Sequence, residues 1–414
     1  MNKLNIFNTL YIFVGVPWLV LMLMFPSTFT EIKYILIIML IFLSIVEIII
    51  KNKKLNSNLI KGISVWLFYF SFSLIVGVLN GFSIDYSLIN IYFITPIVAF
   101  LLASIIDSEK RFIYLNKALI HITMFICLLD IIYILSRINI LPFNFSFKIF
   151  GSTVISSNKL EFRITNQSSL MFLLPYVVSL YFTKGYDTKY EKFIIILTLI
   201  LGFIVTLLSG RRALQGVFFL SFLLTFLFIN IRKGNLNVKL KSNPIKILLR
   251  IIIVIIILCV IIGFLNKLLD IHIIEAFYKT FLSAFDISAS STSKRVTQTL
   301  FLIEGWGESP IIGHGINSYS KDFLASSKTP WSYEMVYIAL LFQTGILGTS
   351  IFFVDVYFIS KKLYKKSKLI KNTSGNYFLA ILIGYLCFVI SGATNPLLYY
   401  VWAWALVFTS YQIH

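Results

Sequence analysis

The chain has 414 residues, of which 58% are hydrophobic and only 13% charged, and its mean hydropathy is +0.89. This composition excludes a water-soluble globular fold, in which about 25% of residues are charged. The formal net charge of +19 does not indicate nucleic-acid binding, because the basic residues stand between apolar runs and not along one soluble face. We therefore expect no nucleic-acid partner.

The apolar residues form runs of about the 20 residues that cross a bilayer as an α-helix. IKYILIIMLIFLSIVEIII at 32–50 is one example, and it lacks the alternation of a β-barrel strand. The sequence predicts an all-α, polytopic integral membrane protein of about twelve transmembrane helices. In chain order we expect spans at 7–25, 32–50, 61–80, 87–106, 112–136, 167–183, 191–208, 212–231, 247–266, 333–360, 377–390 and 395–412.

Basic residues gather in alternate connections between these spans. The connections at 26–31, 81–86 and 391–396 contain no lysine or arginine, whereas the intervening ones do. Because basic connections stay in the cytoplasm, the pattern predicts that both termini are cytoplasmic and that the connections without lysine or arginine lie outside. The basic clusters lie at 51–54, 110–111, 184–192, 232–250 and 361–371.

The simplest division is a single integral membrane domain over 1–414 with two longer outer segments. These are an outer loop at 137–166 and a large outer loop at 267–332, between the predicted ninth and tenth helices. Function is expected there, since loops on a rigid scaffold often carry binding and catalytic residues. Within the larger loop, the apolar spacing of 268–285 predicts either a helix on the membrane surface or a packed loop helix without a ligand.

One outer connection does not follow the charge rule. SGRR at 209–212 places Arg211 and Arg212 between two apolar spans with almost no loop. Paired guanidiniums suit a phosphate or diphosphate, because arginine presents forked donors and stays charged. The alternative is that one or both side chains reach lipid headgroups.

The large outer loop supplies a second group of candidates. Lys294 and Arg295 begin an amphipathic stretch that ends in GESPIIGHG, whose glycines and Pro310 indicate a sharply turned segment. Arg295 is a candidate for the same anionic group, with a solvated loop charge as the alternative. His314 stands between two glycines and is either a ligand contact or a histidine bonded within the fold.

A third group surrounds the start of the tenth predicted span. Glu334 lies there, followed by GILG at 345–348. A carboxylate near arginines at a membrane boundary is suited to act as a general base, and a structural salt bridge is the alternative. Arg163 and Asn395 lie at the same level and are weaker candidates for substrate binding. The three cysteines fall inside predicted spans, so we expect no disulfide and no metal site.

Together these segments resemble the O-antigen ligase and Wzy-type polysaccharide polymerase superfamily. SGRRA at 209–213, Arg295 before ESPIIGHGINSY at 308–319, and Glu334 with GILG carry the resemblance, which covers about residues 165 to 400. It implies inverting, metal-independent, GT-C-like glycosyl transfer without a cofactor at the outer face of the bacterial cytoplasmic membrane. Arg211, Arg212 and Arg295 would bind the undecaprenyl diphosphate of a lipid-linked glycan, and a flippase and a chain-length regulator would be partners.

The resemblance has one departure that bears on activity. The ligase branch carries a histidine where this chain has Glu334, whereas related polymerases often carry an acidic residue there. We therefore expect a polymerase of O-antigen, capsule or exopolysaccharide, with Glu334 as the base and with Arg211, Arg212, Arg295 and Glu334 converging on one outer cavity. The alternatives are an O-antigen ligase and a lipid-linked oligosaccharide flippase; a division-type peptidoglycan polymerase is less favoured because it has fewer spans.

Overall fold

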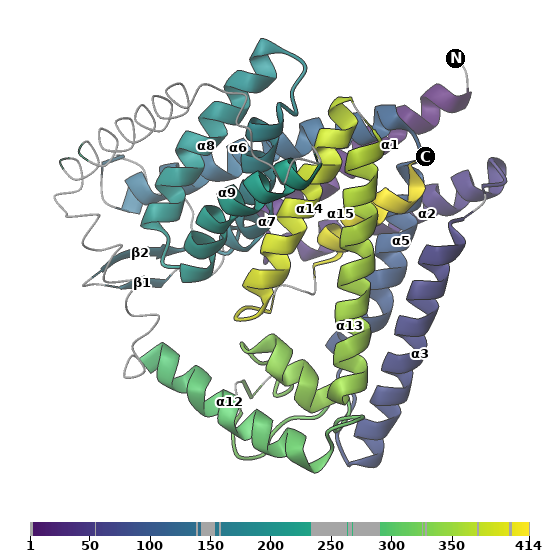
Figure 1. Ribbon diagram of the computed structural model, residues 1–414, viewed down its shortest axis with the longest axis vertical. Coiled ribbons are helices and arrows are strands. Elements are labelled where there is room, and N and C mark those ends of the chain that lie inside the picture. Colours follow the sequence, from purple (N-terminus) through teal and green to yellow (C-terminus); the bar gives the residue numbers. More distant parts are fainter. Residues whose placement is uncertain are drawn as a thin grey trace.

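The computed structural model is a bundle of helices with one small hairpin (Figure 1). It describes residues 3–53, 55–137, 140–141, 154–156, 159–232, 263, 267, 290–324, 326–327, 329–370, 372–396 and 400–413. The helices before the hairpin are α1 (Lys3–Met24), α2 (Thr30–Ile50), α3 (Ser57–Leu79), α4 (Tyr86–Ile89), the π-helical η1 (Asn90–Ile94), α5 (Thr95–Ile105) and α6 (Glu109–Arg137).

The second half of the chain completes the bundle. Strands β1 (Val154–Ser156) and β2 (Lys159–Arg163) pair antiparallel. They are followed by α7 (Gln167–Thr183), α8 (Lys189–Leu208), α9 (Arg212–Arg232), α12 (Ser290–Glu308), α13 (Val336–Leu369), α14 (Thr373–Gly392) and α15 (Val401–Gln412).

The prediction of an all-α, multi-pass membrane protein is confirmed. Among the described residues, eight helices are long and apolar enough to cross a membrane, with α4, η1 and α5 forming one of these spans. Each predicted span except the ninth falls on an observed helix. The ninth, at 247–266, and the helix expected at 268–285 lie outside the described residues, apart from the isolated helical Gly263.

The centre of the bundle is formed by α7 and α14. Every residue of α7 from Gln167 to Leu180 is buried, and so is most of α14. The two helices approach closely because Gly384 has no side chain: a Cβ there would lie 2.9 Å from the carbonyl oxygen of Phe172. Small residues at such crossings let backbones pack tightly where no hydrophobic effect drives association in lipid.

The basic connections share one end of the bundle. There Lys53 pairs with Asp107 at 2.8 Å, Arg111 pairs with Glu47 at 2.9 Å, and Lys117 on α6 pairs with Glu191 on α8 at 2.7 Å. The connections without lysine or arginine lie at the other ends of the same helices. By the charge rule we expect the first end to be cytoplasmic, and we call the ends the cytoplasmic and the outer end on that basis.

The long helix α13 is broken near its outer end. Gly345 has φ 63° and ψ −169°, a backbone conformation that is essentially restricted to glycine. The break separates a short outer piece, 336–344, from the membrane-spanning piece, 346–369. It also removes helical hydrogen bonds, so the backbone groups on both sides need other partners inside the protein.

The turn after α12 supplies these partners. The N–H groups of His314 and Gly315 donate to the carbonyl oxygens of Phe342 and Gln343, at 3.1 and 2.8 Å. In return, the N–H groups of Ile346 and Leu347 donate to the carbonyl oxygens of residues 310 and 311, at 3.0 and 3.1 Å. The expected sharp turn at GESPIIGHG is therefore the segment that fills the break in α13.

The same segment is fixed to the outer end of α3. Asn317 donates to the carbonyl oxygen of Phe82 at 2.9 Å, and the indole of Trp331 donates to Asp85 at 2.8 Å. The Trp331 hydrogen bond lowers the pKa of the Asp85 carboxyl. At Gly315, a Cβ would lie 2.2 Å from the Cα atom of Gly77 on α3, so the contact requires glycine on both sides. We call α12 together with 309–344 the outer unit.

Gly345→Ala should destabilise the protein strongly, since a Cβ at this positive φ would lie 2.3 Å from the carbonyl oxygen of Ile311. We expect a loss of about 3 kcal/mol or more, read as a large drop in the thermal unfolding midpoint in detergent. Gly216→Ala on α9 is the matched control, because a Cβ there meets nothing within 4 Å. Equal effects of the two substitutions would show that the break does not hold the outer unit.

Candidate functional site

The outer unit brings Arg295 and Glu334 together. Arg295 lies in the second turn of α12, and Glu334 ends the loop that leads into α13. The Nε atom of Arg295 donates to Oε2 of Glu334 at 2.8 Å, and the side chains are 33% and 59% exposed. The pair is therefore open to a ligand from the solvent side, although it is rigidly placed.

The rigidity comes from the next turns of α12. Gln298 is buried, and its Oε1 accepts the N–H of Met335, the residue after Glu334, at 2.9 Å. One turn further, Leu302 is buried in a small cluster with Tyr333, Ala339 and Phe342. Residues 295, 298 and 302 follow helical spacing, so one face of α12 positions both members of the ion pair.

Two other candidates from this segment have different surroundings. Lys294 is exposed on α12 next to Arg295. The Nε2 atom of His314 is 2.7 Å from the carbonyl oxygen of Gly305, and its ring lies 4.8 Å from that of Phe342. His314 thus makes internal contacts that hold the turn on α12, and Lys294 can reach a ligand bound beside Arg295.

Arg211 belongs to a second group at the outer end. It lines a cavity of about 200 Å³ together with Thr165, Ser168, Asn395 and Tyr400. Arg211 also immediately precedes α9, so its guanidinium and the N-terminus of that helix both favour an anion here. Burial lowers the pKa of Arg211 because it disfavours the charged guanidinium. The like charge of Arg163 lowers this pKa further, to a lesser degree.

The remaining residues of this group lie around the cavity. Arg212 begins α9 and is half-buried, whereas the Arg163 side chain at the end of β2 is exposed. The amide of Asn395 donates to the carbonyl oxygen of Ser391 at 3.2 Å, which holds this cavity-lining side chain on the end of α14. The structure therefore brings Arg211 and Asn395 into one cavity, with Arg163 near enough to affect Arg211.

A buried polar network supports the Arg211 cavity. The amide of Asn166 donates to Asp130 on α6 at 2.7 Å, and Ser209 donates to Gln167 at 3.1 Å. Gln215 on α9 donates to the carbonyl oxygen of Ser209 at 3.0 Å. These bonds hold the segment that leads into α7 and the connection between α8 and α9 against α6 and α9.

Several buried atoms of this network make no hydrogen bond within the described part of the chain. They are Nε of Arg211, Oδ2 of Asp130, Oδ1 of Asn166 and Oε1 of Gln215. Buried polar atoms of this kind are normally satisfied by water or by a ligand. Nε of Arg211 is the one donor among these atoms and the only one whose side chain lines the cavity, so a phosphate there can accept its hydrogen bond, whereas the three oxygen atoms need a donor such as water.

The sequence carried a signal for this network. NQSS at 166–169 opens an apolar span with four consecutive polar residues, and all four are buried. A membrane helix rarely begins this way unless the polar groups meet partners inside the bundle. Tyr400, whose hydroxyl is 3.2 Å from that of Ser168, had no comparable signal.

The two groups are separate among the residues that the structure describes. Arg295 and Glu334 do not line the cavity at Arg211, and the ion pair that Arg295 makes within the described chain is with Glu334. Figure 1 shows α12 and the start of α13 well apart from the hairpin end of α9. Of the four residues expected to converge, Arg295 and Glu334 meet, and Arg211 faces a cavity of its own.

Glu334→Gln should leave stability nearly unchanged, because exposed ion pairs contribute only about 0–1 kcal/mol. We expect the thermal unfolding midpoint in detergent to stay within about 2 °C of wild type. Gln298→Ala, one turn after Arg295 on α12, should clearly lower the unfolding midpoint, since the substitution removes the buried hydrogen bond to Met335. A large drop of the unfolding midpoint in Glu334→Gln alone would show that the Arg295–Glu334 pair is a structural salt bridge.

Comparison with known proteins does not place the chain in a family: neither the protein-family models nor the curated proteins include a match to this sequence.

Proposed function

We propose that the chain is a polysaccharide polymerase that joins undecaprenyl-diphosphate-linked repeat units at the outer face of the bacterial cytoplasmic membrane. The product would be an O-antigen, a capsule or an exopolysaccharide. The observation that carries the proposal is the exposed Arg295–Glu334 ion pair on a unit fixed to the membrane helices. A base and a cation held side by side suit the transfer of a sugar from a diphosphate to a hydroxyl group.

The proposed reaction is a single inverting displacement. The hydroxyl oxygen of the acceptor sugar bonds to the anomeric carbon of the donor glycan, and the bond from that carbon to the diphosphate oxygen breaks. Glu334 takes the proton from the hydroxyl, and the electron pair of the broken bond leaves with the diphosphate. Arg295 binds Glu334 through Nε, and a guanidinium has four further N–H donors on its two Nη atoms for the leaving phosphate.

The separation of the two groups is a reason to favour a polymerase over a ligase. A polymerase binds two diphosphates, one on the donor chain and one on the lipid-linked acceptor. The donor diphosphate must lie beside Glu334, where Arg295 is. The acceptor diphosphate lies a whole repeat unit away from the attacking hydroxyl, and the Arg211 cavity provides an anion site apart from Glu334. A ligase acceptor does not require this second site.

The remaining candidates take roles at these two positions. Lys294 lies beside Arg295 on the donor side, while Arg163 and Asn395 lie on the acceptor side with Arg211. Arg212 is assigned to the acceptor diphosphate as well. Membrane lipids surround the chain, and the proposed protein partners are a flippase that delivers repeat units and a chain-length regulator.

A lipid-linked oligosaccharide flippase is the second candidate. It is favoured by a large cavity with lysines at the cytoplasmic end, opposite the Arg211 cavity. A flippase has to bind the same diphosphate on both sides of the membrane, whereas a polymerase binds it only outside. Accumulation of repeat units inside cells that lack the gene would select this alternative.

Glu334→Gln should abolish polymer formation while protein level stays normal. Loss of a general base typically slows a reaction by 100-fold or more, so the ladder of surface polysaccharide on a glycan-stained gel should collapse to single repeat units. Glu304→Gln is the control, because it makes the same change at an exposed carboxylate of the outer unit to which no role is assigned. A normal ladder from Glu334→Gln would remove Glu334 from the reaction.

Arg211→Lys should weaken the use of lipid-linked acceptor by about tenfold, since lysine keeps the charge but loses the forked donors. The purified protein is assayed with a lipid-linked repeat unit, and then with the same oligosaccharide on an uncharged alkyl chain. The defect should disappear with the second acceptor. A defect that persists would place the donor diphosphate, and not the acceptor diphosphate, at Arg211; Arg232→Lys at the far end of α9 is the control.

A further inference from the structure

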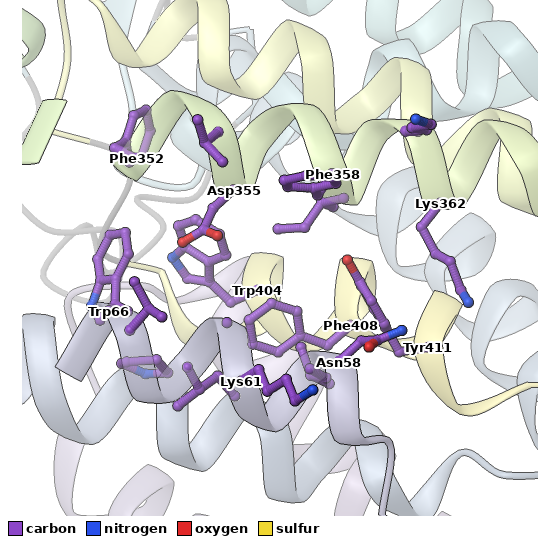
Figure 2. A pocket seen from close by; sticks show the side chains of 18 of the residues that line it. Asn58, Lys61, Trp66, Phe352, Asp355, Phe358, Lys362, Trp404, Phe408 and Tyr411 are labelled. Atoms are coloured by element: carbon purple, nitrogen blue, oxygen red, sulfur yellow. The ribbon is translucent and has the colours of Figure 1, made fainter. Parts of the chain in front are cut away.

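A second cavity of the described chain runs from Val336 and Leu340, in the outer piece of α13, to lysines at the opposite end of the bundle, and it is distinct from the Arg211 cavity. It measures about 650 Å³ and is enclosed by α3, η1, α5, α13 and α15. Its inner wall is aromatic, with Trp66 from α3, Phe352 from α13, and Trp404 and Phe408 from α15 (Figure 2). The volume falls within the range of about 300–1,000 Å³ that is usual for ligand sites.

The cavity opens sideways toward the lipid. Three apolar residues of its lining, Val65, Val354 and Phe358, are about half exposed at 53%, 49% and 53%. They lie on the facing sides of α3 and α13, the two helices between which an acyl chain would enter. An apolar slot that is open to the membrane is accessible to a lipid chain but not to a water-soluble ligand.

Lysines surround the cytoplasmic end of the same cavity. Lys61 comes from α3, and Lys361, Lys362 and Lys365 come from the last turns of α13. Lys61, Lys361 and Lys365 are exposed, and Lys362 lies 5.4 Å from the centre of the Tyr411 ring. Basic pockets between membrane helices at the cytoplasmic side attract anionic headgroups, with each lysine adding to the attraction.

We propose that this cavity binds an anionic phospholipid of the cytoplasmic leaflet, with an acyl chain between α3 and α13 and the phosphate at the lysines. The charge at the mouth selects for an anion, and the aromatic wall selects for a hydrocarbon chain. The proposal does not depend on the activity at Glu334. It assigns the lipid a structural task, because it fills the space between α3, which holds the outer unit, and the membrane-spanning piece of α13.

The one acidic side chain of the cavity is compatible with this orientation. Asp355 points into the cavity from α13 (Figure 2). It precedes Lys361 and Lys362 by six and seven residues, which corresponds to about 9–10 Å along the helix. A phosphate at the cytoplasmic mouth therefore meets the lysines before it reaches the carboxylate.

The test uses the purified full chain in uncharged detergent with two lipids that carry brominated acyl chains, phosphatidylglycerol and phosphatidylcholine. Bromine quenches tryptophan fluorescence at contact, and Trp66 and Trp404 line the cavity. We expect phosphatidylglycerol to quench at roughly tenfold lower concentration than phosphatidylcholine. This difference should shrink when both tryptophans are replaced by phenylalanine.

Charge variants separate the cavity from general attraction to the surface. The triple variant Lys61→Gln, Lys361→Gln, Lys365→Gln should lose most of the preference for phosphatidylglycerol. The matched control is Lys184→Gln, Lys189→Gln, Lys192→Gln, three exposed lysines at the same end that do not line the cavity, and it should keep the preference. Thermal unfolding without lipid checks that both variants fold.

Three results would overturn the proposal. Equal quenching by the two lipids would mean that the cavity does not select an anion. Equal loss of preference in both triple variants would mean that the lipid binds to the general surface. Displacement of phosphatidylglycerol by an equimolar amount of undecaprenyl diphosphate, but not by phosphatidic acid, would make the cavity a substrate site and support the flippase alternative.

Discussion

The break of α13 at Gly345 is the constraint on which the outer half of this protein depends. A helix that stops hydrogen bonding inside a membrane protein leaves donors and acceptors that must be satisfied nearby. Here the turn at 310–315 provides two carbonyl oxygens and two N–H groups in the required register, and Tyr69 on α3 donates to the carbonyl oxygen of Thr344. The break thus fixes the turn, the turn fixes α12, and α12 places Arg295 against Glu334.

The distribution of charge follows from the same requirement that buried polar groups find partners. At the cytoplasmic end the charges pair with each other, as Lys117 does with Glu191. At the outer end, Arg211 and the network beneath it retain buried atoms without a hydrogen bond to the described chain. Arg211 Nε is the one cationic atom among them, and it supports the proposal of an anionic ligand at the outer end, whereas the paired charges at the other end stabilise the fold.

Much of the fold was predictable from hydropathy, because bilayer thickness fixes the length of each apolar run. The sequence also indicated the glycine-rich turn, but not its partner: Gly345 lies about 30 residues after Gly313 and Gly315, and their contact depends on tertiary packing. The Arg295–Glu334 pair was anticipated as one part of a larger cluster. The separate position of Arg211 was not, since spacing along a membrane chain does not show which outer connections are neighbours.

The most direct test of the central claim is to incubate the purified chain with lipid-linked repeat units and to analyse the lipid fraction by mass spectrometry. The proposed activity predicts that undecaprenyl diphosphate is released in equal amount to new glycosidic bonds, that the joined repeats remain on a lipid diphosphate, and that Glu334→Gln gives neither product. If no new glycosidic bond forms and intact lipid-linked units instead move across the bilayer of a vesicle, the chain is a transporter and the claim is wrong.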